Sequence, residues 1–472
     1  MKKGLVLVAI AGILVFSGLI YGINMILAQS DDVQISCEVL KGDAAAAEGI
    51  SFLIGNQLQE GLYWDSYITL HEKTEDIEVH TVFEDKWKQR SDNVNYFGSS
   101  LYDEIVSIYS ANDYVVWNGG IIDFSAISHH STVLFTQEEM EAIAERTQPG
   151  ETYTEEIPLN NYMTYYDVDM STHLSAGSYY VVGDMYDRVK NFFEIQVPDS
   201  HMYKISITKD KDGRIVQVGC GSESLAFKEC GVQTSDGLYF GFYGVKEERV
   251  EDLTMGSGNG IFCIPLKTAE KESDSGDNSE TVIYYNQLAN VFPLPEKDCY
   301  PLEILTDEAE ENLFLLTCEN KKAVLRIIEK ETMTEKQKLE LMDFNGILGH
   351  NGYEQQMDLH DEGIVIIIND NSFCFVTKKD GIYKKQIVTN LGEGLGQSNE
   401  YLYDLAYQND KLILLVAKSQ IWNSEVYLHV LSEKGIEYTG LFVPSFSYER
   451  PDVHRVHLRK DNALEILESN VK

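Results

Sequence analysis

Apolar segments recur at near-constant intervals in the last third of this chain, which has 472 residues. Each recurrence is an apolar run, an acidic or Asn/Gly turn, and a second apolar run. The first aliphatic residues after these turns are Leu313, Ile364, Leu412 and Leu464, which are 51, 48 and 52 positions apart. About 40–50 residues with four strands is the size of one blade of a β-propeller. The spacing therefore predicts a mainly β, repetitive fold.

The clearest repeat contains four strand-like segments, which are EQQMDLHD, GIVIIIND, SFCFVTKK and GIYKKQIVT. The last repeat ends after its second strand and so lacks strands. Because propellers complete such a blade with strands from earlier in the chain, we expect the donors to lie between Tyr162 and Val218. At this spacing, residues 156–472 have room for about six blades. A seven- or eight-bladed ring that also includes the preceding region is the alternative.

The chain divides into three parts on this interpretation. Residues 1–30 come first, residues 31–155 hold short alternating segments that favour strands, and residues 156–472 hold the propeller-like repeats. In the second part, the tract Ala44–Ala47 predicts a single helical turn. In the third part, the polar stretch 268–280 predicts an exposed, flexible insertion.

One helix is predicted at the end of the second part. Thr136 and Glu139 form a capping box, and Ile143 lies with neighbouring apolar residues on one face. Pro149 and Gly150 end the run. The helix therefore marks the boundary with the repeats.

The stretch Gly4–Ala28 is an apolar run of 25 residues without a charge. A helix of this length rises about 37 Å, enough to cross a hydrocarbon layer of about 30 Å. Two lysines precede the run and two aspartates follow it, and basic residues remain on the cytoplasmic side. We therefore expect a single-pass membrane anchor with the bulk of the chain outside the cytoplasm.

A cleaved secretory signal is the alternative for this stretch. The two-lysine start and the small residue Ala28 suit a signal peptidase. The apolar core is longer than the roughly 7–15 residues usual in cleaved signals, so we favour the anchor over secretion.

The chain is strongly acidic, with a formal net charge of −38 at pH 7. Such a field repels phosphate backbones and anionic lipid head groups, so we expect no nucleic-acid partner. We interpret the acidity mainly as a solvated surface. It also suits loosely held calcium ions or a basic partner, although no residue pattern defines a cofactor site.

The seven cysteines form neither a C-x-x-C pair nor a cluster flanked by histidine, which argues against a zinc ribbon or a redox dithiol. Cys263, Cys318 and Cys374 sit inside apolar strand patterns and are predicted to be core thiols. Cys220 and Cys230 are separated by a likely turn. A disulfide between them in an oxidising compartment is the alternative to two thiols.

No Asp box, G-x-S-x-G elbow, H-E-x-x-H motif or phosphate-binding loop is present. We therefore assign no catalytic, cofactor-binding or metal-binding residue. His129 and His130 are adjacent, so on a strand they would point to opposite faces. Asp167 and Asp169 would share a face, and we interpret them as a solvated edge rather than as paired carboxylates.

Glycine and tyrosine are the remaining unusual residues. The glycine-rich stretches Gly256–Gly260 and Gly392–Gly396 do not open a helical pattern, so we interpret them as flexible loops rather than nucleotide sites. The 28 tyrosines are explained by strand content, with a sugar- or peptide-binding face as the alternative. The cluster behind that alternative is Tyr162, Tyr165, Tyr166, Tyr179 and Tyr180.

Three segments, Gly42–Ile50, Tyr63–Leu70 and Ala144–Asp169, are followed by the propeller-like repeats. In this order they resemble a group of single-span envelope proteins of Gram-positive bacteria. The resemblance implies an N-terminal anchor and a β-rich ectodomain, and it brings no activity or site residues.

A repeat scaffold without a catalytic motif favours a non-enzymatic role. We expect a membrane-anchored, extracytoplasmic binding or scaffolding protein that meets a protein or cell-wall partner. The alternative is an extracytoplasmic hydrolase that uses carboxylates at the mouth of a propeller.

Overall fold

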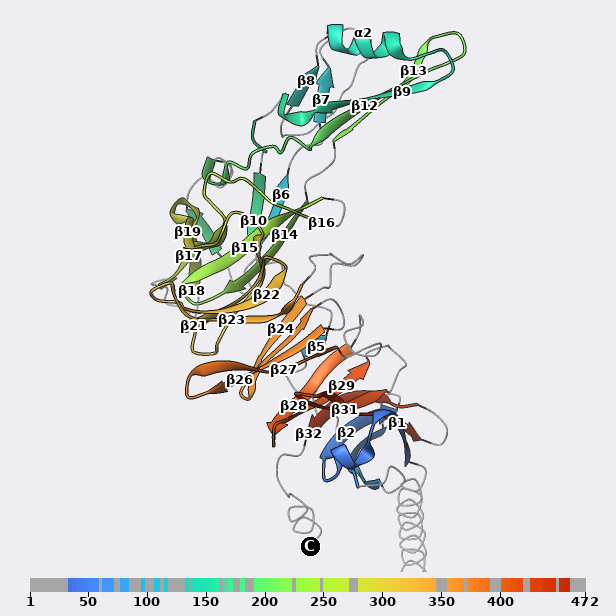
Figure 1. Cartoon of the computed structure of the whole chain (residues 1–472), viewed down its shortest axis with the longest axis vertical. Helices are drawn as coiled ribbons and strands as arrows, with labels where there is room; N and C mark the ends of the chain where they lie inside the picture. The colour runs from blue at the N-terminus through green and yellow to red at the C-terminus, as the bar shows by residue number, and fades with distance from the viewer. Residues whose placement is uncertain are drawn as a thin grey trace, which may run out of the picture. The chain divides into compact units, whose positions relative to one another are not determined.

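The structure is a computed structural model of the whole chain (Figure 1). It describes residues 33–58, 62–71, 77–84, 95–97, 106–110, 114–117, 132–135, 137–161, 164–166, 168–172, 179–182, 191–222, 226–246, 249–270, 279–344, 355–368, 372–390, 400–418, 425–446 and 450–458.

The fold is mainly β, as predicted. Its residues divide into two compact units, one made of 1–101 with 358–472 and the other of 102–357. The second unit ends at Met357, within the strand β24 (Gln355–His360), and the first unit resumes at Asp358.

The first unit contains the helical turn η2 and thirteen further strands among the described residues. They are β1 (Val33–Gly42), η2 (Ala44–Ala47), β2 (Ser51–Leu58), β3 (Leu62–Thr69), β4 (Glu78–Glu84), β5 (Asn95–Phe97), β25 (Gly363–Ile368), β26 (Ser372–Lys379), β27 (Ile382–Asn390), β28 (Glu400–Gln408), β29 (Lys411–Lys418), β30 (Val426–Ser432), β31 (Gly435–Phe446) and β32 (Asp452–Leu458).

Besides its strands, the described part of the second unit contains the α-helix α2, two helical turns and the helical residues 191–193. They are β6 (Val106–Ser110), β7 (Tyr114–Trp117), β8 (Thr132–Phe135), α2 (Gln137–Arg146), β9 (Thr152–Pro158), η3 (Leu159–Asn161), β10 (Val168–Thr172), β11 (Tyr179–Val182), β12 (Met202–Lys209), β13 (Ile215–Ser222), β14 (Ala226–Gln233), β15 (Gly237–Lys246), β16 (Arg249–Glu251), β17 (Gly260–Glu270), β18 (Ser279–Tyr284), η4 (Tyr285–Gln287), β19 (Ala289–Pro293), β20 (Cys299–Thr306), β21 (Asn312–Glu319), β22 (Lys322–Glu329) and β23 (Thr334–Asp343).

The four-strand repeats are confirmed. The strands β20–β23, β24–β27 and β28–β31 form three successive runs of four neighbours in chain order. Leu313, Ile364 and Leu412 are each the second residue of the second strand in their run, and all three are buried. The fourth predicted position, Leu464, lies outside the described residues.

The donor strands for the last repeat differ from the prediction. β32 pairs with β2, with Phe52 opposite Leu458, and β3 and β4 continue the same sheet. Figure 1 shows the blue N-terminal strands beside the red C-terminal ones. The expected donors between Tyr162 and Val218 are therefore wrong. Apolar alternation marks a strand as half-buried, but it does not say which distant strand is its neighbour.

The sheet of β28–β31 is packed on both of its faces in the first unit. Ile413 and Leu415 contact the β2–β3 sheet, whereas Leu412 and Leu414 contact β25 and β26. A strand covered on both faces reads as a continuous apolar run, which explains the sequence LILLVA. The division at residue 156 stays a prediction, although two sheets of this unit combine strands from both predicted regions.

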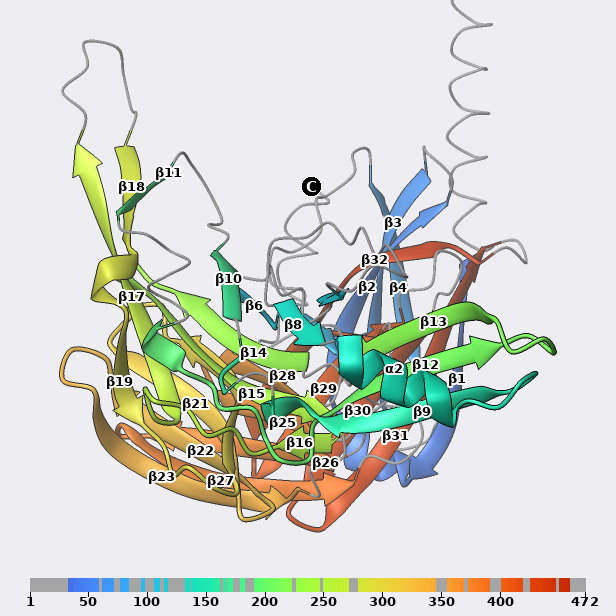
Figure 2. The same cartoon turned by 90° about the horizontal axis from the view of Figure 1, so that it is seen from above.

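The predicted helix is confirmed as α2, and its Ile143 is buried. The three-stranded sheet β13-β12-β9 lies beneath this helix (Figure 2). The predicted turn Ala44–Ala47 is confirmed as η2, where the Asp43 side chain accepts a hydrogen bond from the backbone N–H of Ala45. A short polar cap therefore suffices to begin this turn.

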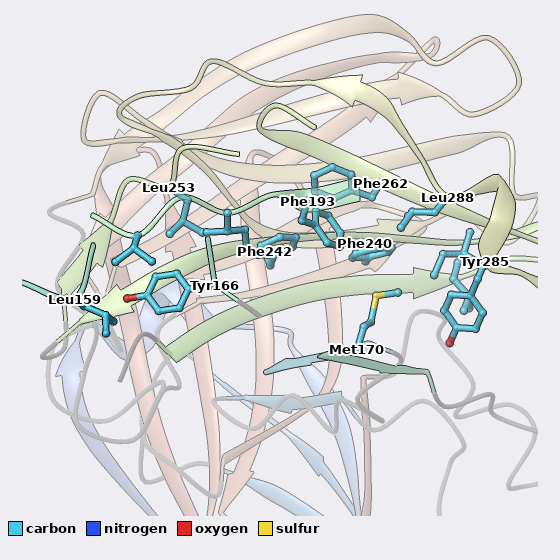
Figure 3. Packing of buried hydrophobic residues seen from close by; sticks show 14 of the residues in the cluster. Leu159, Tyr166, Met170, Phe193, Phe240, Phe242, Leu253, Phe262, Tyr285 and Leu288 are labelled. Carbon is cyan, nitrogen blue, oxygen red and sulfur yellow. The ribbon is translucent and has the colours of Figure 1, made fainter. Parts of the chain in front are cut away.

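The core of the second unit is built from aromatic rings. Phe193, Phe242 and Phe262 pack with ring centroids 5.0–5.6 Å apart (Figure 3). Phe193 belongs to a segment that the sequence predicts to be a strand, yet residues 191–193 are helical and only isolated bridges form after them, at Ile195 and Gln196. Tertiary packing of the rings prevails over the local strand propensity.

The structure also tests the predictions about the cysteines. Cys263, Cys318 and Cys374 are confirmed as buried thiols, and Cys230 is also a buried free thiol rather than half of a disulfide.

The insertion predicted at 268–280 is wrong at its ends, because β17 and β18 continue into it and pair there. Long strands can extend past the last apolar residue when their backbones still pair.

The helices of the described segments are all too short or too polar to cross a membrane. The stretch Gly4–Ala28 is not among those segments, so the predicted anchor stays a prediction.

Candidate functional site

A small hollow, partly open to solvent, lies in the second unit where β15, β16 and β20 come together. We call it the acidic pocket. It is lined by Phe242, Tyr243, Val250, Glu251, Asp252, Leu253, Met255, Asn259, Glu296, Cys299 and Tyr300. Its polar lining is dominated by three carboxylates and two tyrosines, which is a lining that attracts positive charge.

Glu251 is placed by the short strand β16, which pairs antiparallel with the end of β15 so that Glu251 lies opposite Gly244. The aromatic segment of β15 is buried in the core. The pairing therefore fixes the backbone of Glu251 at the border between the core and the pocket. The Glu251 side chain remains 18% exposed.

A buried histidine holds this carboxylate. The Nε2 atom of His201 lies 2.6 Å from Oε2 of Glu251, and the His201 side chain has no exposed surface. The Ser200 hydroxyl donates to Oε1 of the same carboxylate at 3.1 Å. Both carboxylate oxygens of Glu251 therefore have a fixed hydrogen-bond partner.

The other ring nitrogen of His201, Nδ1, forms a hydrogen bond with the hydroxyl of Tyr166. Tyr166 is fully buried, and its ring lies edge-on to the imidazole with centroids 5.7 Å apart. Tyr166, His201 and Glu251 thus form one continuous chain of hydrogen bonds from the core to the pocket, which we call the relay.

The chemistry of Glu251 and Tyr166 determines which atom of each hydrogen bond in the relay carries the proton. An ionised carboxylate can only accept, so Nε2 of His201 carries the proton that faces Glu251. In a neutral imidazole the other nitrogen is then an acceptor, and the Tyr166 O–H donates to it. This arrangement leaves every group in the relay with a complementary partner.

Backbone hydrogen bonds hold the relay residues in place. The N–H of Tyr166 donates to the carbonyl of Ile195 at 2.8 Å, and the carbonyl of His201 accepts from the N–H of Leu159 at 2.8 Å. Figure 3 shows Tyr166 and Leu159 in the same buried cluster as Phe242. The relay is therefore anchored to a packed core rather than to a surface loop.

The opposite wall of the pocket is aromatic. The rings of Tyr243 and Tyr300 lie with centroids 4.9 Å apart. The side-chain amide of Asn259 donates to the carbonyls of Pro295 and Cys299, each at 2.7 Å. Asn259 thereby holds the loop that carries Glu296 against the pocket.

Cys299 is the one thiol in the lining. Burial is the largest cause that raises its pKa to about 12, and the nearby Glu319 carboxylate also raises it. A thiol with this pKa is protonated at neutral pH and is a poor nucleophile. The acidic pocket therefore offers carboxylate and hydroxyl chemistry rather than thiolate chemistry.

A second small hollow lies in the first unit. Cys37, His71 and Tyr438 line it together with apolar residues. Burial raises the pKa of Cys37 as well. No carboxylate is among the described residues that line it, so its chemistry is less defined than that of the acidic pocket.

The glycines Gly256, Gly258 and Gly260 lie beside the acidic pocket, in the turn that leads into β17. A Cβ atom on Gly260 would be 2.4 Å from Oδ1 of Asn290. Gly258 has a φ of +72°, which favours glycine. Close approach and turn geometry explain the glycine at these two positions, and the flexibility of this loop stays a prediction.

Most of the other sequence candidates fall outside the described residues. These are His129, His130, Asp167, the stretch 392–396 and the side chain of Asp169. In the tyrosine cluster, Tyr165 is 42% exposed whereas Tyr166 is buried in the relay. Tyr162 and the side chains of Tyr179 and Tyr180 are not described, so a sugar- or peptide-binding face stays a prediction.

The sequence analysis missed both His201 and Glu251. They are 50 positions apart and belong to no motif. The described residues hold no group of three or more His, Cys, Asp or Glu side chains arranged for a metal ion. The expected calcium ions stay a prediction.

No protein-family model matches the chain, and no curated protein matches it. Among solved structures, it is similar to a periplasmic gluconolactonase of Pseudomonas aeruginosa, at 11% identity and a TM-score of 0.21, covering 66% of this chain and 99% of that one. It is also similar to an apocarotenoid oxygenase of Synechocystis, at 7% identity and a TM-score of 0.24, covering 91% and 96%. These scores are too low to establish a shared fold or activity.

Proposed function

We propose that this chain is a membrane-anchored, extracytoplasmic binding protein without enzymatic activity. Its anchor is the stretch Gly4–Ala28, and its β-rich bulk is a propeller of about six blades that meets a protein or cell-wall partner. The three runs of four strands support the propeller. A C-terminal reporter that is active only outside the cytoplasm tests the topology, and a cytoplasmic reporter would contradict it.

The acidic pocket is the ligand site of this protein, and its ligand is a small organic cation. The observation that carries this proposal is the meeting of Glu251, Asp252 and Glu296 with the Tyr243–Tyr300 pair in one hollow. Carboxylates attract a cation, and aromatic faces add cation–π contact, which is the combination that recognises ammonium groups. The large negative charge of the chain would raise the local concentration of such a ligand.

The test is a titration of the full chain, in detergent, with choline. The matched control ligand is 3,3-dimethyl-1-butanol, which has the shape of choline without its charge. We expect choline to bind and the neutral alcohol to bind at least tenfold more weakly. Glu251→Gln should weaken choline binding by about tenfold, because a charge-assisted contact is lost. Equal binding of the two ligands would contradict the proposal.

A hydrolase is the second candidate, and the convergence of Glu251, Asp252 and Glu296 in one pocket favours it. Paired carboxylates can act as general acid and base on a glycosidic bond. The test is turnover of a panel of nitrophenyl glycosides and esters by the full chain. Turnover that disappears in Glu251→Gln would support this candidate over the binding protein.

A further inference from the structure

We infer that His201 and Tyr166 are positioning residues that hold Glu251 in the orientation in which it meets the ligand of the acidic pocket. The inference rests on the proposed cation-binding function and deepens it. It assigns a role to two buried side chains that do not themselves line the pocket.

Burial separates the roles of the three relay residues. Glu251 lines the pocket and is 18% exposed, whereas the side chain of His201 has no exposed surface. A ligand in the pocket therefore meets the carboxylate and not the imidazole. The side chain of His201 therefore acts on a ligand through the hydrogen bond between its Nε2 and Oε2 of Glu251.

The need for orientation follows from the length of the glutamate side chain. A glutamate has three rotatable side-chain bonds, and fixing them on ligand binding costs conformational entropy. The relay fixes them beforehand, with His201 on Oε2 and Ser200 on Oε1. A site whose groups are already in place binds more tightly than one that must order them.

Tyr166 contributes by holding the ring of His201. The Glu251 carboxylate can only accept, so it keeps the proton of a neutral imidazole on Nε2, and the Tyr166 hydroxyl then donates to Nδ1. Without that hydroxyl, Nδ1 loses this donor inside the core, and the ring is no longer held on that side. Tyr166 thus acts on Glu251 through His201.

Choline titration of full-chain variants tests this assignment. His201→Leu removes the donor and should weaken choline binding about tenfold. His201→Gln supplies an amide N–H in its place and should bind within about threefold of the native chain. Tyr166→Phe should fall between these two, and Tyr165→Phe, which alters the exposed neighbouring tyrosine, is the matched control and should bind choline like the native chain.

Nitrogen-15 NMR of the imidazole gives a second readout that needs no ligand. The native chain should show His201 with its proton on Nε2 alone. Tyr166→Phe should shift the Nδ1 resonance, because that nitrogen loses its donor, and should keep the proton on Nε2, where Glu251 accepts it. This readout separates positioning from a purely structural role, because a side chain that only packs would leave the Nδ1 resonance unchanged.

Failure of the proposed function and failure of this inference give different experimental results. Failure of the native chain to bind choline overturns the proposed function, whereas the tautomer measurement still tests the relay. Native-like binding by a folded His201→Leu variant overturns the inference while leaving the proposed function intact. If His201→Leu does not unfold cooperatively, the His201→Gln and Tyr166→Phe results decide. A native His201 protonated on Nδ1 overturns the inference by itself.

Discussion

Asp404 accepts a hydrogen bond from the backbone N–H of Leu458 at 2.9 Å, which ties β32 to β28. The same carboxylate accepts from the N–H of Leu405 at 2.8 Å. We expect Asp404→Ala to lower the free energy of unfolding by about 1–3 kcal/mol, because partly buried backbone donors lose a charged acceptor. Urea unfolding of the full chain measures this effect. Glu433→Ala, in the exposed turn between β30 and β31, is the control and should change stability by about 0.5 kcal/mol or less.

Glu319 and Arg326 form a buried ion pair between β21 and β22, with a closest N–O distance of 2.7 Å. Burial acts to raise the pKa of Glu319, but hydrogen bonds from Lys338 and Arg326 outweigh it, so the pKa is lower than usual. A carboxyl whose pKa is lower in the folded state contributes stability above pH 4.5 and loses it as the pH falls through the folded value.

Part of the loss of unfolding free energy in acid should therefore come from Glu319, and Glu319→Gln should remove that part. We expect this variant to be less stable than the native chain at pH 7 and to lose less stability between pH 5 and pH 3. Unfolding in urea at a series of pH values measures both. Glu340→Gln, an exposed carboxylate on β23, should keep the native pH dependence. A parallel pH profile for Glu319→Gln would contradict the prediction.

His429 is fully buried in β30, and burial lowers its pKa to about 3. Because the unfolded chain binds a proton on this residue below its ordinary value of 6.5 and the folded chain does not, acid favours unfolding. We therefore expect this residue to lower the free energy of unfolding by about 2 kcal/mol as the pH falls from 7 to 5.

His429→Gln should flatten the pH dependence of unfolding between pH 7 and pH 5. Thermal unfolding in this range is the measurement. The native chain is the reference. If His429→Gln keeps the native profile, His429 is not the group responsible.

Gly260 approaches its neighbours too closely to carry a side chain. A Cβ atom there would lie 2.6 Å from the carbonyl oxygen of Phe292. We expect Gly260→Ala to cost about 1–3 kcal/mol of stability and to weaken choline binding, since Asn290 also holds the carbonyl of Asn259 beside the acidic pocket. Gly219→Ala in β13 is the control, because the nearest atom there is 3.8 Å from the added Cβ.

The sequence was sufficient for features that depend on neighbouring residues. The repeat positions Leu313, Ile364 and Leu412 became equivalent places in three runs of strands, because apolar periodicity reports burial directly. The turn at Ala44–Ala47 depends on one capping aspartate, which the sequence also displays. Local patterns of this kind predict strands and turns without knowledge of the strand with which each one pairs.

The pairings between distant segments could not be predicted in the same way. Strand β2 is as apolar as its competitors, and its pairing with β32 depends on the fit of whole sheets. His201 and Glu251 are likewise ordinary in sequence and acquire a role only because β16 and the start of β12 meet. A lone histidine in an apolar segment is usually part of the core, so its sequence gives no signal of the relay.

The pairing of β1 with β31 and of β2 with β32 has a consequence for biosynthesis. These N-terminal strands need strands from the other end of the sequence as neighbours, so these two sheets stay incomplete until β31 and β32 have been synthesised. Until then, apolar residues such as Phe52 and Ile54 lack these neighbours. A chain of this kind depends on holding factors during its synthesis more than one whose first strands fold on their own.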